Sequence, residues 1–284
     1  MTATISRLNG IDIGDINTVN GITHDSISEI NGITHESGFE NTYSLKQTTS
    51  PYGGYVDIAS PSSYHFESGG TDSAFSISLW IKPTYGASYW MVSKADTGKK
   101  EYIFGLWGSG VVIWALYSND GGSQYIQQYD GVDRRSALAD GNWHHLAATY
   151  DGSEAETGLT FYVDNSAVTA GRSINGYSDL NDSGGNLRIG GWATNSNTFL
   201  GYIDEVSMWN KELSAAEVDS TYNDGAPSDL SEHSAAANLL SWWRMGDNNG
   251  GTGVRVTDVQ GVGNGTLTSF QSADGFTSTT VPGS

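Results

Sequence analysis

The sequence predicts an all-β protein in which two antiparallel sheets pack face to face. Short runs of aromatic and β-branched residues follow one another along the chain, separated by clusters of Gly, Asn, Asp and Ser. The 37 glycines suit many tight turns, while 9 Trp and 15 Tyr are too many for a disordered chain. Strands at this spacing without intervening helices indicate a two-sheet sandwich with Greek-key connections.

An internal repeat with a period of eleven residues occupies positions 5–37. Its copies are ISRLNGIDIGD, INTVNGITHDS and ISEINGITHES. An eleven-residue apolar period is also compatible with a right-handed helical coiled coil. Each copy, however, places Asn-Gly among β-branched residues, and each glycine costs a helix about 1 kcal/mol. We therefore predict an extended or turn-rich β arm over residues 1–38.

The arm is too short to bury its own apolar residues. We expect these residues to pack on identical copies, on another protein or on the following domain, so residues 1–38 are interpreted as an assembly arm. By analogy with fibres, we expect a homo-oligomer and favour a trimer. The apolar repeat positions are Ile5, Leu8, Ile11, Ile16, Val19, Ile22, Ile27, Ile30 and Ile33.

The sandwich is expected over residues 39–226. Its clearest strand is 75–81, in which Trp80 lies on one face and the other face carries Phe75, Ile77, Leu79 and Ile81. Further strands are expected at 55–58, 88–94, 101–107, 110–117, 123–129, within 140–152, and at 159–163, 187–191 and 202–209.

One short helix is predicted after the last of these strands. Ser214 and Glu217 have the spacing of a capping box, in which the serine side chain accepts a hydrogen bond from the Glu217 amide. The helix is expected to stop before Gly225. Residues 227–284 are expected to add closing strands to the sandwich.

Charge and composition exclude several classes of partner. The chain carries 13 Lys+Arg and 32 Asp+Glu, and its net charge of −19 repels nucleic acid. It has no cysteine, so neither a disulfide nor a thiolate metal site can form. No apolar run is long enough to span a bilayer, and residues 1–10 lack the features of a secretory signal. We expect neither a nucleic-acid nor a membrane partner.

The order of the motifs resembles a known family over residues 43–223. The motifs are YVDI (55–58), SISLWIKP (76–83), DGNWHHLAATYDG (140–152), FYVD (161–164), LRIGG (187–191) and GYIDEVSMWNKELSAAEV (201–218). Together they resemble the laminin G-like, pentraxin-related branch of the concanavalin A-like jelly rolls. The resemblance implies a jelly roll that binds glycans or adheres to surfaces, often with a structural calcium ion and without catalysis.

The repeated arm combined with such a domain also resembles structural proteins of tailed bacteriophages. This second resemblance implies a place on the virion surface, with other virion proteins as partners through residues 1–38 and a cell-surface glycan as ligand. A secreted polysaccharide-active enzyme, or its carbohydrate-binding accessory module, is the alternative.

Glycan recognition needs aromatic faces for sugar rings and loops that supply hydrogen bonds. The aromatic candidates near predicted turns are Trp90, Trp107, Tyr125 and Trp192, and each could instead belong to the core. The candidate hydrogen-bonding loop contains Asn119 and Asp120. Two other tryptophans lie within predicted strands and are expected to be buried, namely Trp80 and Trp114.

A calcium site, as the resemblance implies it, would use Asp204. In related jelly rolls this position often faces an early strand, and acidic residues are common before the position of Tyr55, where this chain has Gly53 and Gly54. Capping of a turn or pairing with Arg or Lys is the alternative role for Asp204. Calcium is nevertheless the cofactor that we expect.

No catalytic constellation is evident in the sequence. Sugar-cleaving relatives carry carboxylates that alternate along one strand, and no Glu-x-Asp-x-x-Glu occurs here. Asp204 and Glu205 are neighbours in a predicted strand and would point to opposite faces, as would His144 and His145. We therefore expect a protein that is not an enzyme.

Overall fold

The structure is a computed structural model. It describes residues 39–48, 54–59, 61–84, 88–96, 98–108, 110–168, 171–192 and 197–283, together with six two-residue strands between residues 7 and 34. The chain divides into two compact units, Met1–Glu40 and Asn41–Ser284.

The described part of the first unit consists of three antiparallel hairpins, one from each repeat. β1 (Arg7–Leu8) pairs with β2 (Ile11–Asp12), β3 (Thr18–Val19) with β4 (Ile22–Thr23), and β5 (Glu29–Ile30) with β6 (Ile33–Thr34). The register is the same in all three and pairs Leu8 with Ile11, Val19 with Ile22, and Ile30 with Ile33. The prediction of a β structure is confirmed, while Ile5, Ile16 and Ile27 lie outside the described residues.

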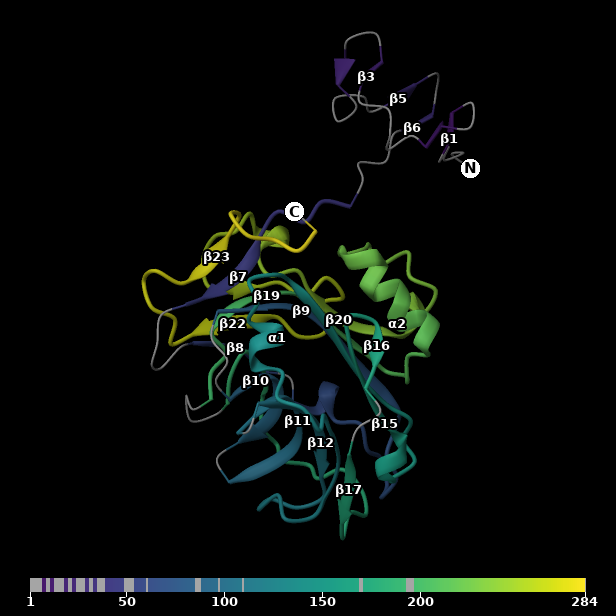
Figure 1. Ribbon diagram of the computed structural model, residues 1–284, viewed down its shortest axis with the longest axis vertical. Helices are drawn as coiled ribbons and strands as arrows, with labels where there is room; N and C mark the ends of the chain where they lie inside the picture. The colour runs from purple at the N-terminus through teal and green to yellow at the C-terminus, as the bar shows by residue number, and fades with distance from the viewer. Residues whose placement is uncertain are drawn as a thin grey trace. The chain divides into compact units, whose positions relative to one another are not determined.

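The second unit is a sandwich of two antiparallel sheets (Figure 1). The first sheet has nine strands. In spatial order these are β17 (Arg172–Asn175), β13 (Tyr125–Tyr129), β12 (Val111–Tyr117), β11 (Lys99–Trp107), β10 (Tyr89–Asp96), β18 (Leu187–Ile189), β8 (Tyr55–Ile58), β22 (Gly265–Thr268) and β21 (Arg255–Val256).

The second sheet has eight strands. Seven follow one another as β16 (Ser166–Ala167), β15 (Leu159–Val163), β14 (His144–Tyr150), β9 (Phe75–Pro83), β19 (Gly201–Trp209), β7 (Ser44–Gln47) and β23 (Gly275–Thr277). The eighth, β20 (Leu239–Trp243), pairs with β19. Together the two sheets confirm the predicted all-β sandwich.

Alternation along the strands places the core between the sheets. The predicted inner face of β9 is buried, and Trp114 of β12 reaches across the core, where its Nε1 donates to the Thr149 carbonyl at 3.1 Å. Trp80 lies on the other face of β9, where its ring stacks on Tyr222 at 5.9 Å. Both tryptophans are therefore buried, as predicted, but Trp114 lies in the core between the sheets and Trp80 lies outside it, against Tyr222 of α2.

The predicted helix is α2 (Ala215–Tyr222), and it begins at the predicted capping box. The Glu217 amide donates to Ser214 Oγ, and the Ser214 amide donates back to the Glu217 carboxylate. A further single turn, α1 (Arg135–Leu138), was not predicted. Among the described residues, no helix has the length and apolarity that crossing a bilayer requires.

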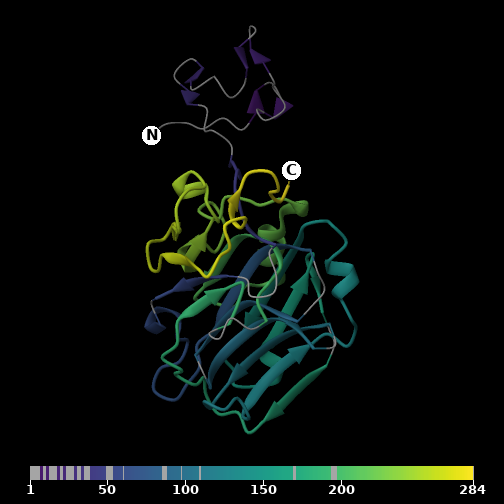
Figure 2. The same ribbon diagram turned by 90° about the vertical axis from the view of Figure 1, so that its left-hand side faces the viewer.

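Residues 227–284 contribute strands to both sheets, because β22 pairs with β8 and β23 pairs with β7. The yellow C-terminal segment therefore runs beside strands from the other end of the sandwich sequence (Figure 2).

Candidate functional site

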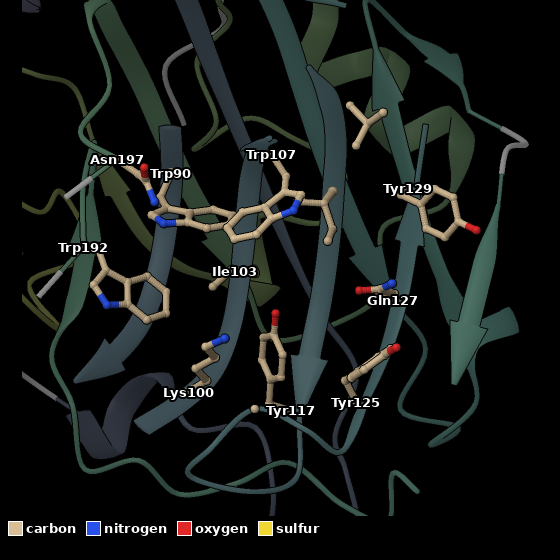
Figure 3. Close-up of a pocket in the computed structure, with 13 residues that line it drawn as sticks. Trp90, Lys100, Ile103, Trp107, Tyr117, Tyr125, Gln127, Tyr129, Trp192 and Asn197 are labelled. Atoms are coloured by element: carbon tan, nitrogen blue, oxygen red, sulfur yellow. The ribbon is translucent and has the colours of Figure 1, made fainter. Parts of the chain in front are cut away.

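An aromatic cleft of about 530 Å³ lies on the outward face of the nine-stranded sheet (Figure 3). In β11 the residues Tyr102, Phe104 and Leu106 belong to the core, so Ile103 and Trp107 between and beyond them face outward. The same alternation in β12 and β13 turns a second apolar set outward, including Ile113, Tyr117, Tyr125 and Tyr129. This sheet is thus apolar on both faces, and such an outer patch marks a binding surface.

Three tryptophans form one end of the cleft. The rings of Trp90 and Trp107 stack with centroids 5.3 Å apart and planes 26° apart, and Trp192 lies 5.8 Å from Trp90. Gly105 lies opposite Trp90 in the register, where a Cβ atom would come within 2.7 Å of the Trp90 ring. Trp90 is buried whereas Trp107 is 50% exposed, so Trp107 presents ring surface to a ligand.

The other end of the cleft combines rings with polar groups. The rings of Tyr117 and Tyr125 lie 6.4 Å apart, and Lys100 Nζ lies 5.0 Å from the centre of the Tyr117 ring. Gln127 Nε2 donates to Ser173 Oγ at 2.9 Å, which fixes the orientation of this amide in the cleft. Aromatic walls with a few oriented polar groups are what a small-molecule or sugar site requires.

All four aromatic candidates from the sequence line this cleft: Trp90, Trp107, Tyr125 and Trp192. The two loop candidates do not line it. Asn119 Oδ1 accepts from the Ser123 amide at 2.9 Å and so holds its own turn, while Asp120 accepts from Asn181 Nδ2 at 3.0 Å.

Several cleft residues were not identified from the sequence, namely Lys100, Tyr117, Gln127 and Tyr129. A signal for three of them exists. Tyr117 continues the outward alternation of β12, and Gln127 and Tyr129 continue that of β13 from Tyr125. The alternation of every second residue along these strands would have predicted that Tyr117, Gln127 and Tyr129 face outward, once the outer face was known to be apolar.

The expectation that Asp204 and Glu205 point to opposite faces is wrong. β19 has a bulge between Asp204 and Ser207, where Glu205 has φ +47°. Ile203 and Val206, which flank the two carboxylates, both belong to the core. One extra residue in the strand therefore turns Asp204 and Glu205 to the same side, away from the core. Both are buried, so they form no open catalytic pair.

The surroundings of Asp204 contain groups that suit a hard cation. Asp204 Oδ2 accepts from Asn41 Nδ2 at 3.0 Å, and Asn41 Oδ1 is buried without a hydrogen-bond partner among the described residues. Burial, with the neighbouring Glu205 charge as a smaller cause, raises the pKa of Asp204 well above its ordinary value. Burial also raises the pKa of Glu205 to about 7, although Arg244 opposes this rise.

The partner of Asp204 comes from an earlier segment than the one before Tyr55 that the resemblance pointed to. The early strand that pairs with β19 beside the carboxylate is β7, and Asn41 lies in the segment that leads into it. Asp204 and Asn41 thus offer carboxylate and amide oxygens, the kinds of ligand that calcium prefers.

A second group of potential ligands is already occupied by protein partners. Ligand atoms of His65, Glu101 and Asp182 lie within 4.8 Å of one another. Glu101, however, accepts from His65 Nδ1 at 2.8 Å and pairs with the buried Lys94. We interpret this group as a charge network within the fold.

The adjacent histidines meet different partners, as expected for neighbouring strand residues. His144 Nδ1 lies 2.8 Å from Asp164 Oδ2, while His145 Nε2 lies 2.8 Å from Ser78 Oγ. Burial lowers the pKa of His145 to about 3, so it is neutral in the folded protein at ordinary pH.

Residues 51–219 match the concanavalin A-like lectin/glucanases superfamily. Among solved structures, a candidate carbohydrate-binding protein from Bacteroides ovatus is 16% identical with a TM-score of 0.53, covering 86% of this chain and 62% of its own. The heptameric SAP-like pentraxin from Limulus polyphemus is 18% identical with a TM-score of 0.40, covering 63% of this chain and 80% of its own. This chain thus spans less than two thirds of the Bacteroides protein. No curated protein matches it.

Proposed function

Because the chain belongs to the concanavalin A-like lectin/glucanases superfamily, we propose that its sandwich is a glycan-binding module without catalytic activity. The aromatic cleft carries this proposal, since stacked tryptophans with one half-exposed ring offer a face for sugar rings. Among the described residues that line the cleft, none is Asp or Glu. Cleavage of a glycosidic bond by the usual mechanism needs a carboxylate pair, which supports binding over hydrolysis.

A glycan array probed with the purified chain tests this function. We expect binding to a defined subset of glycans and no release of reducing sugar from the polysaccharides that contain them. A blank array would reject the glycan-binding proposal, whereas hydrolysis of a bound polysaccharide would favour the alternative of a polysaccharide-active enzyme.

We further propose that residues 1–38 anchor this module in a tailed-phage particle, so that the chain is a virion adhesion protein. Three hairpins with apolar inner pairs support an assembly role. An isolated two-stranded hairpin is marginally stable in water, so each repeat needs a partner surface. Identical copies in a homo-oligomer, favoured here as a trimer, or neighbouring virion proteins would supply it.

Deleting residues 1–38 is expected to abolish incorporation into the particle and to convert an oligomer into a monomer, because the partner surface is lost. Quantitative mass spectrometry of purified particles and analytical ultracentrifugation measure the two effects. Substituting aspartate for Ile11, Ile22 and Ile33 together is the gentler variant and should act in the same direction. A full-length chain that sediments as a monomer and still enters the particle would contradict the anchoring role.

We also propose that Asp204 and the side-chain oxygen of Asn41 hold a structural calcium ion. The orphaned Asn41 Oδ1 and the buried carboxylate support this assignment. When bound, the cation would compensate the charge of Asp204 and tie the segment before β7 to β19. The Asp204 carboxylate would then remain ionised where burial otherwise favours its protonation.

Without calcium, the free energy of unfolding is expected to fall as the pH rises. The pKa values of Asp204 and Glu205 are raised in the folded state, so the folded protein holds these protons longer than the unfolded chain. The stability is therefore lost between about pH 4.5 and about pH 7, the interval over which Glu205 ionises in the two states. We expect a loss of at least about 1 kcal/mol, the equivalent of roughly one pKa unit.

Urea unfolding in EDTA at pH 5 and pH 8, repeated with excess calcium, measures this effect. Glu205→Gln should flatten the fall with pH, which separates Glu205 from the histidines. Calcium should restore stability at pH 8 in the wild type and not in Asp204→Asn. Equal calcium stabilisation in the two proteins would show that the ion binds elsewhere.

A further inference from the structure

Lys100 lines the aromatic cleft, whereas the neighbouring Lys99 does not. Lys100 is the one charged residue among the described residues that line the aromatic cleft, and it has no ion pair with any of them. Lys99 is exposed and pairs with Asp120 at 3.6 Å between Nζ and Oδ2. Lys100 therefore brings a positive charge to the lining of the cleft in a chain whose net charge is −19.

The fold makes room for the Lys100 side chain at the cleft. Gly122 has φ +65°, and a Cβ atom there would lie 2.5 Å from Lys100 Cδ, so a larger residue would displace the lysine. Lys100 is half-buried, and this burial lowers its pKa. Its ammonium group is compensated within the described structure by the face of Tyr117, an interaction weaker than pairing with an anion.

We infer that the cleft takes an acidic glycan, with Lys100 pairing to a carboxylate or sulfate group while the tryptophans stack on a sugar ring. This inference rests on the proposed glycan-binding function and names its ligand class. The backbone positions of Lys100 and Trp107 lie seven residues apart on β11, about 23 Å at roughly 3.3 Å per residue. We expect an oligosaccharide that lies along β11, with its acidic group near the Tyr117 end.

An array of matched glycans tests this assignment. It pairs uronic-acid oligosaccharides with their methyl esters and sulfated galacto-oligosaccharides with their unsulfated forms, which also distinguishes carboxylate from sulfate. For the pair that gives the strongest signal, calorimetry then measures dissociation constants for the wild type, Lys100→Met and Lys99→Met. The second variant is the matched control, because it removes the same charge one residue away and outside the cleft lining.

We expect the wild type and Lys99→Met to bind the acidic member about tenfold more tightly than its neutral form, the size of one charge-assisted hydrogen bond. Lys100→Met should remove that preference, so that it binds the two members of the pair with similar affinity. Equal affinity of the wild type for the acidic and neutral members, or a preference that persists in Lys100→Met, would overturn the acidic ligand while leaving the proposed function intact. Binding of no glycan at all would overturn both.

Discussion

Replacing Trp107 by alanine is expected to weaken glycan binding about 30-fold while leaving the fold intact. Trp107 offers an exposed ring that is held in place by the buried Trp90 beneath it. A rigid aromatic anchor in a binding surface typically contributes about 2 kcal/mol or more, which is roughly 30-fold in affinity. Because the ring is 50% exposed, we expect the free energy of unfolding to fall by less than about 1 kcal/mol.

Calorimetry with the strongest glycan from the array, together with urea unfolding, measures both effects. Ile174→Ala is the matched control, since Ile174 is 49% exposed on β17 of the same sheet and does not line the cleft. It should leave the affinity unchanged. An affinity of Trp107→Ala equal to that of the wild type would move the glycan site away from this cleft.

Replacing Asp258 by alanine is expected to destabilise the sandwich by about 4 kcal/mol. This buried carboxylate accepts hydrogen bonds from the Ser241 hydroxyl and from four backbone amides, of Trp242, Gln260, Val262 and Gly263, at 2.9 to 3.1 Å. Alanine would leave these donors without their acceptor, and a buried unsatisfied donor costs about 1–3 kcal/mol. Relaxation and entry of water should offset part of the sum.

Urea unfolding monitored by tryptophan fluorescence measures this loss. Asp258→Asn keeps one acceptor oxygen in a side chain of the same shape, so its destabilisation should be roughly half that of the alanine variant. If alanine and wild type unfolded at the same urea concentration, residues 255–268 would not be an integral part of the sandwich.

The strands could be predicted from the sequence because their residue patterns are strong and local. In β9 the apolar residues recur with period two, and the structure buries that face. The capping box at Ser214 is equally local and is confirmed. Which sheet each strand joins depends on pairings between distant segments, such as β23 with β7, and these have no local signal.

The candidate site was predictable in part for the same reason. Aromatic residues beside turns were recognisable in the sequence. The position of Lys100 in the cleft was not, because the cleft forms only when β10 and β12 lie on either side of β11. The bulge at Glu205 was not predictable, because a left-handed backbone at a residue other than glycine is set by tertiary context. That bulge is what brings the two buried carboxylates together.

The pairing of β7 with β23 has a consequence for biosynthesis. Ser44 Oγ donates to the Thr280 carbonyl at 2.6 Å although the two residues are 236 positions apart in the sequence. The ribosome must therefore release nearly the whole domain before β7 finds its second neighbour, β23, so folding finishes late and contact order is high. Until then the nascent chain exposes unpaired strand edges, and its yield in cells should depend on chaperones that shield them.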